Sequence, residues 1–366
     1  MKTFITLLGC MFLFASCEDF LKKDIQIPMA DTAPKLVVTS ALEDSLFYVY
    51  VSLSTPINSQ ISLSSQRIDE ALIELFDGED QILEITQRDK YPESEWGNSY
   101  YINTPFALRT DIKVVPGQTY TLKVSVEGYP PVSSTVTAPS SVLAYGAQTW
   151  LDQSVDKTEN IAFVDQDYFG SCPSFVPISF RIKDDSGEKD YYMLEAFEVA
   201  NENTSIANLY LNSQRFLLAT SDRTLVQDNP DIVADQWLSE TDINTFAFGQ
   251  MIVSDLSFQG QEKAFNLLMS SCLLHYEKRN DCERLHQYYP DRVYTIHYKL
   301  YATIRHLNEE SYHYYRTFAL QRIGLDFFSE PVSLISNIEG GYGCFAVCTT
   351  SKVLLAEYDV CYVHYY

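Results

Sequence analysis

From residue 35 onward, short runs of apolar and β-branched residues alternate with polar turns. This pattern suits β-strands, in which successive side chains point to opposite faces. Asp77-Gly78, between two such runs, is a typical hairpin turn, and Tyr120, Leu122 and Val124 fall on one face of a later run. The runs cover residues 35–40, 46–53, 71–76, 81–85, 116–126 and 132–136. Short strands at this spacing predict a β-sandwich of immunoglobulin or transthyretin-like type over residues 35–139.

Residues 140–366 continue the β pattern and predict a larger β-rich domain with a few helices. The runs 177–183 and 191–199 flank an acidic turn and predict a hairpin. The polar residues 221–240 predict a long loop with a short helix. Residues 293–304 alternate clearly and predict a strand. Asn308, followed by two glutamates, is a typical N-cap, so a helix is predicted over residues 309–323.

The N-terminus carries an apolar run, Phe4 to Phe14, between Lys2 and Ala15-Ser16-Cys17. A basic start, a short apolar stretch and small residues before a cysteine are typical of a bacterial lipoprotein signal peptide. The run is shorter than the ~20 residues that a transmembrane helix needs, and a buried strand would not explain its flanks. We therefore predict a signal peptide over residues 1–16, lipidation of Cys17, and a lipid-anchored tether over residues 17–34.

The tether indicates where the protein is expected to lie. Glu18 and Asp19, directly after the lipidated cysteine, resemble the surface-export signal of Bacteroidota lipoproteins, although an unspecialised linker explains them equally well. The expected location is the outer membrane, with the lipid holding the chain to the membrane and the folded part facing the cell exterior. Asp31-Thr32-Ala33 and Asp44-Ser45-Leu46 resemble the O-glycosylation sequon of the same bacteria, so Thr32 and Ser45 are candidate modification sites.

The chain is strongly acidic. Removal of residues 1–16 takes away one lysine and leaves 25 basic against 49 acidic residues, a net charge of −24. Nucleic acid is therefore excluded as a partner, because binding its phosphates requires a basic surface. An acidic surface is compatible with divalent cations or a basic partner, but solubility alone also explains it.

Six cysteines remain when Cys10 leaves with the signal peptide and Cys17 carries the lipid. An even number in an exported protein predicts disulfides, although six cysteines allow fifteen pairings. Cys272 and Cys282 flank a charged segment and are the pair that the sequence favours. Cys344 and Cys348 are too far apart along a strand to bridge each other, so each is expected to pair with Cys361 or Cys172. The candidates are Cys172, Cys272, Cys282, Cys344, Cys348 and Cys361.

The motifs of catalytic and cofactor-binding proteins are absent from the sequence. It contains no G-x-S-x-G, Walker A or dinucleotide-binding fingerprint. Cys272, His275, Cys282 and His286 superficially suggest zinc, but the spacing is narrower than usual and an oxidising compartment favours a disulfide. Asp165-x-Asp167 and the segment 184–188 could supply calcium ligands, yet the second is better interpreted as a turn. His306 and His313 lack metal-ligand spacing. We predict no catalytic residue, no metal and no cofactor.

Tyrosines are frequent towards the C-terminus, between Tyr288 and Tyr366. Exposed, they could form stacking platforms for sugars or a protein contact. Aromatic residues in strands are more often core and cross-strand pairs, which is the interpretation that we prefer.

Residues 328–346 carry the sequence's most recognisable segment. Ser336-Asn337-Ile338 and Gly341-Tyr342-Gly343-Cys344-Phe345 follow a predicted helix that contains Leu320-Gln321-Arg322. This order resembles the C-terminal signature of a Bacteroidota lipoprotein family defined by a domain of unknown function, DUF4249. The lipobox, the 34–38 opening and the 116–124 strand also match, but the cysteines around 272–282 and 344–361 depart from the pattern. Asn337 and the glycines suit a tight turn, so we interpret the signature as structural.

The resemblance implies a two-part, mostly β outer-envelope lipoprotein, often encoded near TonB-dependent transporters, with no established enzyme activity. The leading hypothesis is a non-enzymatic accessory protein that assists such a transporter in nutrient uptake. A surface structural or adhesion protein that binds glycans or envelope polymers through the aromatic-rich C-terminal domain is the alternative, and an enzyme comes third. Residues 16–21 also resemble the start of SusD-like glycan-binding lipoproteins, but those are helical-repeat proteins, and no sustained helical periodicity is found here.

Overall fold

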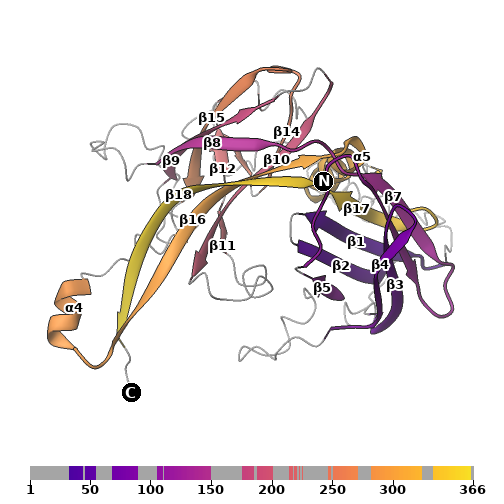
Figure 1. Cartoon of the computed structure of the whole chain (residues 1–366), viewed down its shortest axis with the longest axis horizontal. Helices are drawn as coiled ribbons and strands as arrows, with labels where there is room; N and C mark the ends of the chain where they lie inside the picture. The colour runs from indigo at the N-terminus through magenta and orange to yellow at the C-terminus, as the bar shows by residue number, and fades with distance from the viewer. Residues whose placement is uncertain are drawn as a thin grey trace, which may run out of the picture. The chain divides into compact units, whose positions relative to one another are not determined.

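The computed structural model of the chain is mainly β, as the sequence predicts (Figure 1). The residues described are 33–43, 46–54, 68–89, 105–109, 111–149, 175–184, 188–200, 214–216, 218–220, 222, 225, 246–248, 250–270, 282–323 and 333–363. The chain divides into two units, Met1–Pro34 and Lys35–Tyr366, and every element below belongs to the second. None of the helices in these described ranges is both long and apolar enough to cross a membrane.

Two four-stranded sheets enclose the first core, and together we call them the first sandwich. One has the order β17 (Tyr342–Val347), β1 (Leu36–Glu43), β2 (Leu46–Leu53) and β5 (Ala107–Arg109). The other has the order β4 (Asp80–Gln87), β3 (Glu70–Asp77), β6 (Thr119–Ser125) and β7 (Val132–Thr137). Val38, Phe47, Ile73 and Leu122 point into the shared core from alternate positions of their strands. The predicted turn at Asp77-Gly78 joins β3 to β4, and Gly78 has a φ of 61°.

β17 enters the first sandwich from the far end of the sequence. It pairs in parallel with β1, from Val37 opposite Tyr342 to Leu42 opposite Val347. Phe345 and Val347 are fully buried in the first core. The first sandwich therefore contains a strand that lies outside residues 35–139.

Two further sheets form the second sandwich. One has the order β11 (Gln214–Phe216), β10 (Tyr191–Ala200), β16 (Val293–Leu307) and β18 (Thr349–Val363), and β14 (Met251–Ser254) also pairs with β10. The other has the order β13 (Phe246–Phe248), β12 (Leu218–Thr220), β15 (Glu262–Ser270), β9 (Phe175–Lys183) and β8 (Leu143–Thr149). Phe180 and Phe265 from one sheet share a core with Leu194 and Ile304 from the other.

The predicted hairpin between residues 177–183 and 191–199 is wrong. β9 pairs with β8 and β15, whereas β10 pairs with β11, β14 and β16 in the opposite sheet. Phe180 of β9 and Leu194 of β10 both point into the core between the sheets. The segment from 184 to 190 thus joins strands of the two facing sheets. Apolar runs separated by a turn predict two strands correctly but do not say whether the strands pair or face each other.

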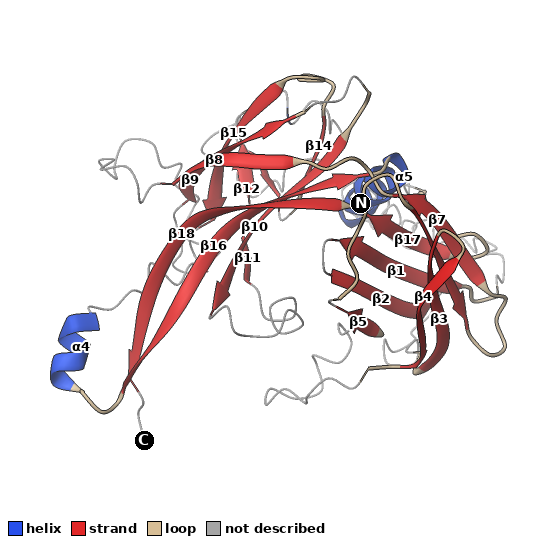
Figure 2. Ribbon diagram, viewed as in Figure 1, coloured by secondary structure: helices blue, strands red, loops and turns tan. Residues whose placement is uncertain are grey.

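Two helices in the described ranges accompany the sheets (Figure 2). α5 (Glu309–Ile323) begins as predicted, with the Ser311 backbone amide donating to the Asn308 side chain at 3.3 Å. Its Tyr314 packs beside Ala41 and Ala346 of the first sandwich, and its Tyr312 beside Tyr191 of the second. α4 (Cys282–Tyr288) immediately precedes β16.

Candidate functional site

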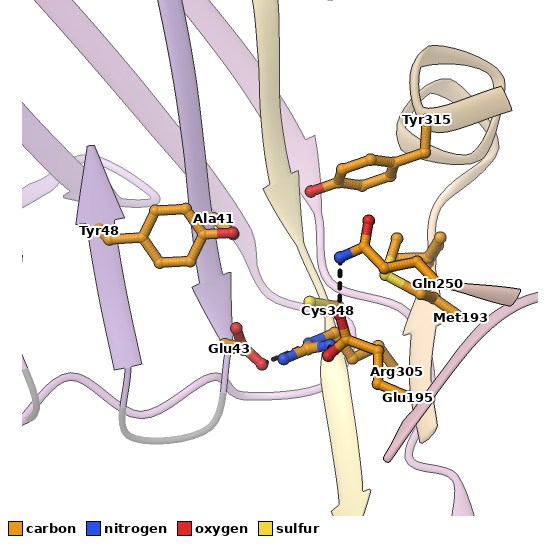
Figure 3. Close-up of a pocket in the computed structure, with 10 residues that line it drawn as sticks. Ala41, Glu43, Tyr48, Met193, Glu195, Gln250, Arg305, Tyr315 and Cys348 are labelled. Atoms are coloured by element: carbon orange, nitrogen blue, oxygen red, sulfur yellow. Dashed lines mark hydrogen bonds and ion pairs between the residues drawn. The ribbon is translucent and has the colours of Figure 1, made fainter. Parts of the chain in front are cut away.

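A pocket lined by charged side chains lies where the two sandwiches meet (Figure 3). β16 brings Arg305, β10 brings Met193 and Glu195, and β1 brings Glu43. The remaining lining residues are Ala41, Tyr48, Gln250, Leu307, Tyr315 and Cys348. In β10 and β16 the even-numbered residues 194, 196, 300, 302 and 304 fill the second core. The odd-numbered Glu195 and Arg305 therefore point to the opposite face, towards β1.

Arg305 lies between two buried carboxylates, as Figure 3 shows. Its Nε donates to Glu43 Oε2 at 2.6 Å, and its Nη1 donates to Glu195 Oε2. Gln250 Nε2 donates to the other oxygen of Glu195 at 2.6 Å. The side chains of Glu43 and Glu195 are only 6% and 2% exposed. Burial by itself would lower the pKa of Arg305, but Glu195 and Glu43 together raise this pKa well above its ordinary value.

The cavity has a volume of about 40 Å³, enough for a few water molecules and far too small for a substrate. Burial raises the pKa values of the Cys348 thiol and the Tyr315 hydroxyl well above their usual ranges, so both stay protonated at neutral pH. Neither Cys348 nor Tyr315 is therefore poised as a nucleophile or base. The arrangement acts as an ionic clamp between the two sandwiches.

The segment that precedes β17 docks that strand onto β1. The Asn337 side chain donates to the carbonyl of Phe345 at 2.8 Å and accepts from the amide of the same residue at 2.9 Å. Gly340 and Gly343 have φ values of 80° and 112°, in the region that favours glycine. A Cβ atom on Gly343 would lie 1.9 Å from the Val38 carbonyl oxygen. These contacts agree with the structural interpretation of the signature at residues 336–345.

The comparison with known families agrees with the resemblance found in the sequence. A model of a domain of unknown function, DUF4249, matches residues 22–353. The chain belongs to the DUF4249 family. No curated protein matches the sequence. The matched range includes β1 to β17 and ends within β18, so Cys361 lies beyond it.

The cysteines of this DUF4249 protein pair differently from the sequence-based expectation. Cys282 forms a disulfide with Cys361, with the two Cα atoms 5.4 Å apart. The predicted Cys272–Cys282 pair is therefore wrong, and Cys282 is unavailable for the zinc alternative. Closeness in the sequence favours the shorter loop, between Cys272 and Cys282. In the structure, the pairing of β16 with β18 instead brings the start of α4 beside the end of β18. Cys172 and Cys272 lie outside the described residues.

The remaining two cysteines of the DUF4249 protein are buried free thiols, contrary to the expectation that each pairs elsewhere. Cys344 donates to Ser311 Oγ at 3.7 Å and Cys348 to the Leu42 carbonyl at 3.8 Å. Burial raises the pKa of Cys344 to about 12. The candidate sites Cys17, Thr32 and Ser45 also lie outside the described residues, so their modification stays a prediction.

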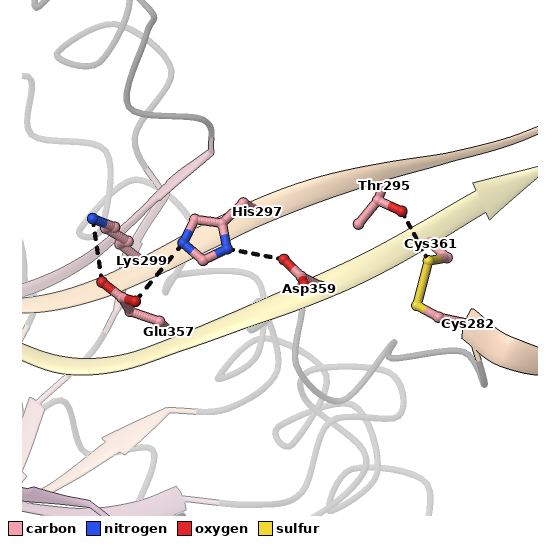
Figure 4. A network of polar contacts seen from close by, with 7 residues as sticks. All are labelled: Cys282, Thr295, His297, Lys299, Glu357, Asp359 and Cys361. Carbon is pink, nitrogen blue, oxygen red and sulfur yellow. Dashed lines mark hydrogen bonds and ion pairs between the residues drawn. A yellow bond between two sulfur atoms is a disulfide. The ribbon is translucent and has the colours of Figure 1, made fainter.

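The end of the β16–β18 ribbon is the second feature of the DUF4249 protein that bears on function (Figure 4). Within the described ranges, β10 pairs with β16 only from Tyr298 onward, and residues 293–297 and 359–363 continue beyond it as a two-stranded ribbon. The Cys282–Cys361 disulfide ties α4 to this ribbon. His297 Nδ1 lies 2.9 Å from Asp359, and Lys299 lies 3.2 Å from Glu357. We call residues 282–297 and 359–363 the ribbon tip.

The aromatic residues of the C-terminal half divide into two groups. Tyr298 and Tyr358 stack on each other and are buried, as predicted for most of this set. Tyr288, Tyr289 and Tyr294 are 64%, 42% and 42% exposed, and all three lie on the ribbon tip. His286 is exposed on α4, whereas His306 is buried and His313 lies beside Glu309. The exposed tyrosines were within the predicted set, but the sequence did not separate them from the buried ones.

Sequence analysis missed the Arg305 clamp. The signal was present, because Glu195 and Arg305 interrupt two apolar strands at positions that alternate with core residues. A charge on such a face is ordinarily solvated. Nothing in the sequence indicated that β1 covers this face.

Proposed function

We propose that this protein is a non-enzymatic outer-membrane lipoprotein that binds a TonB-dependent transporter and assists it in nutrient uptake. The lipobox at Cys17 and the acidic tether support the location, and the family resemblance supports the kind of partner. The proposal of a binding function rests on the ribbon tip. This segment presents three exposed tyrosines on a projection of the sheet that a disulfide holds in place. Tyrosine is enriched in the energetic centres of protein interfaces, because it buries a large area at a low entropic cost.

The charged cavity favours the same conclusion. Its carboxylates are engaged by Arg305 and its volume is too small for a nutrient or substrate. The ribbon tip is our candidate for the binding surface, because it has the densest exposed aromatic character in the described part of the chain.

The decisive experiment is a pull-down of the full-length protein from solubilised outer membranes. The wild type should recover a β-barrel transporter in stoichiometric amount. The double variant Tyr288→Ser/Tyr289→Ser should recover at least about tenfold less, since losing an interface hot spot costs about 2 kcal/mol or more. Leu143→Ser on β8 is the matched control, because Leu143 is 62% exposed but lies away from the ribbon tip. Recovery of the lipoprotein alone in all three samples would refute the transporter partnership.

The lipid anchor needs a separate test. Cys17→Ala should release the protein from the membrane fraction, and the wild type should label with a lipid precursor. Continued fractionation of the variant with membranes, together with no labelling of the wild type, would contradict the proposed anchor.

A surface adhesion protein that binds glycans is the second candidate. The observation that favours it is the same exposed group, since tyrosine rings with an open face can stack on sugars. Tight binding in a glycan array that is lost in Tyr288→Ser/Tyr289→Ser, without recovery of a transporter, would establish this function in place of the first.

A further inference from the structure

Three aspartates meet at one end of the second sandwich. Asp184 directly follows β9, Asp190 directly precedes β10, and Asp255 directly follows β14. The pairing of Tyr191 with Ser254 places Asp190 and Asp255 side by side, and the Asp255 amide donates to the Asp190 carbonyl at 3.0 Å. One carboxylate oxygen from each of the three residues lies within 4.8 Å of the other two. The cluster thus joins a strand of one sheet to two strands of the facing sheet.

Asp184 and Asp190 have partners of their own. Asp184 Oδ2 accepts from the Gly260 amide at 2.9 Å, and Tyr192 forms a side-chain hydrogen bond with Asp184. Asp190 Oδ1 lies 3.1 Å from His306 Nε2. The other ring nitrogen of His306 lies 2.9 Å from the Ser140 carbonyl, which can only accept, so this Nδ1 carries a hydrogen.

Asp255 differs from both. It is fully buried, and in the described part of the chain neither of its carboxylate oxygens makes a hydrogen bond of normal geometry. Burial raises the pKa of Asp255 to about 6, and the charges of Asp184 and Asp190 add to this, while the Asp190 backbone offsets only part of it. A buried carboxylate without a partner is costly and calls for an explanation.

Among the contacts described for the cluster, negative charge exceeds positive charge. Even a doubly protonated His306 supplies one positive charge against three carboxylates. A net negative charge in a buried position is strongly unfavourable unless protons or a cation compensate it. Calcium is bound by oxygen ligands at about 2.3–2.6 Å, so oxygens up to about 5 Å apart can share one ion. The spacing of the three aspartates satisfies this condition.

We infer that Asp184, Asp190 and Asp255 bind one divalent cation of the calcium type, which links the two sheets of the second sandwich. Three carboxylates give the site its charge, and carbonyl oxygens or water complete the six to eight ligands that calcium takes. The unpartnered oxygens of Asp255 are the ligands that the fold leaves available. Of the three, only Asp184 was a candidate from the sequence, within an apparent turn, because Asp190 lies at the other end of that connection and Asp255 comes from a separate one.

The test uses the full-length protein in detergent after treatment with EDTA. Calcium titration by calorimetry should give one site with a Kd between about 10⁻⁵ and 10⁻³ M. At 100 times Kd, the Tm should rise by about 5 °C, because a ligand that binds only the folded state stabilises it. Terbium at the calcium site should luminesce on excitation of the neighbouring Tyr192, and Tyr192→Phe should lose most of that signal while still binding calcium.

The variant Asp255→Asn distinguishes cation binding from the alternative that protons shared among the three aspartates compensate their charge. In EDTA this variant should be at least as stable as the wild type, because the substitution removes a buried, unpartnered charge. Its calcium response should fall by at least about 100-fold. Asp359→Asn is the control, because Asp359 is an exposed carboxylate that pairs with His297. This variant should keep the full calcium response.

Two results would overturn the site. One is an unchanged Tm of the wild type at 10 mM calcium or magnesium, which would show that protons alone compensate the cluster. The other is a calcium response that survives in Asp255→Asn, which would assign the binding to the acidic surface. Neither result would affect the proposed partnership with a transporter, which the pull-down tests separately.

Discussion

At the scale of single residues, the fold depends on side chains that are buried with their charge and on glycines that leave room for a neighbouring backbone. Arg305 has its carboxylate partners 262 and 110 positions away in the sequence. Gly343 has a backbone carbonyl where its Cβ would be. Both residues join elements that are far apart in the chain. Their importance therefore becomes visible only in the folded structure.

Arg305→Met should destabilise the protein by about 3–5 kcal/mol, because Glu43 and Glu195 would remain buried without a counter-charge. The matched control is Arg181→Met. Arg181 contacts Glu262 at 2.8 Å, but both side chains are about half exposed, so its loss should cost at most about 1 kcal/mol. Urea unfolding measures both values. Equal effects would mean that the Arg305 clamp contributes no more than a surface ion pair.

Gly343→Ala should cost more than about 3 kcal/mol, or prevent folding, because the added methyl group would collide with Val38 and the φ of 112° would be strained. Gly117→Ala is the control. Gly117 also has a positive φ, 77°, but a Cβ there meets nothing within 4 Å, so only about 1 kcal/mol of backbone strain is expected. A similar loss in the two variants would contradict the steric argument for β17.

At the scale of elements, local patterns predicted what each segment is but not which segment it pairs with. The alternation at residues 293–304 and the Asn308 cap correctly gave β16 and α5. The same reasoning made a hairpin of β9 and β10, which lie in facing sheets. The sequence indicated the C-terminal tyrosines and Asp184 as candidates. It indicated neither the Arg305 clamp nor the aspartate cluster. Such groups form through contacts between distant segments, which periodicity does not encode.

The ribbon tip should depend on its disulfide, because the structure describes only two paired strands there, and a two-stranded ribbon is marginally stable. In Cys282→Ser, the amides of residues 294–297 and 359–362 should exchange hydrogen at least about tenfold faster. Amides of residues 299–304 should be unchanged, because β10 and β18 cover both edges of β16 there. Hydrogen exchange by mass spectrometry resolves the two regions. Equal protection in the variant would show that strand pairing alone holds the tip.

At the scale of the whole molecule, a strand from near the end of the chain pairs with the first strand. β17 follows α5, pairs with β1, and is followed directly by β18 of the second sandwich. The last hundred residues therefore contribute to both cores, with Phe345 in the first and Tyr358 in the second. A boundary drawn along the sequence does not separate the two sandwiches. The first sandwich is complete only when β17, from the last part of the chain, is in place.

Residues 35–139 expressed alone should consequently fail to show a cooperative unfolding transition. The fragment lacks Phe345 and Val347, which fill its core with no exposed surface, and it leaves one edge of β1 unpaired. Fusion of residues 333–348 to its end through a flexible linker of about 15 glycine and serine residues should restore a transition in urea. The same fusion with Phe345→Ser should fail, because the core would again be incomplete. A cooperative transition of residues 35–139 without the added strand would show instead that β17 is an accessory to a sandwich that is already stable by itself.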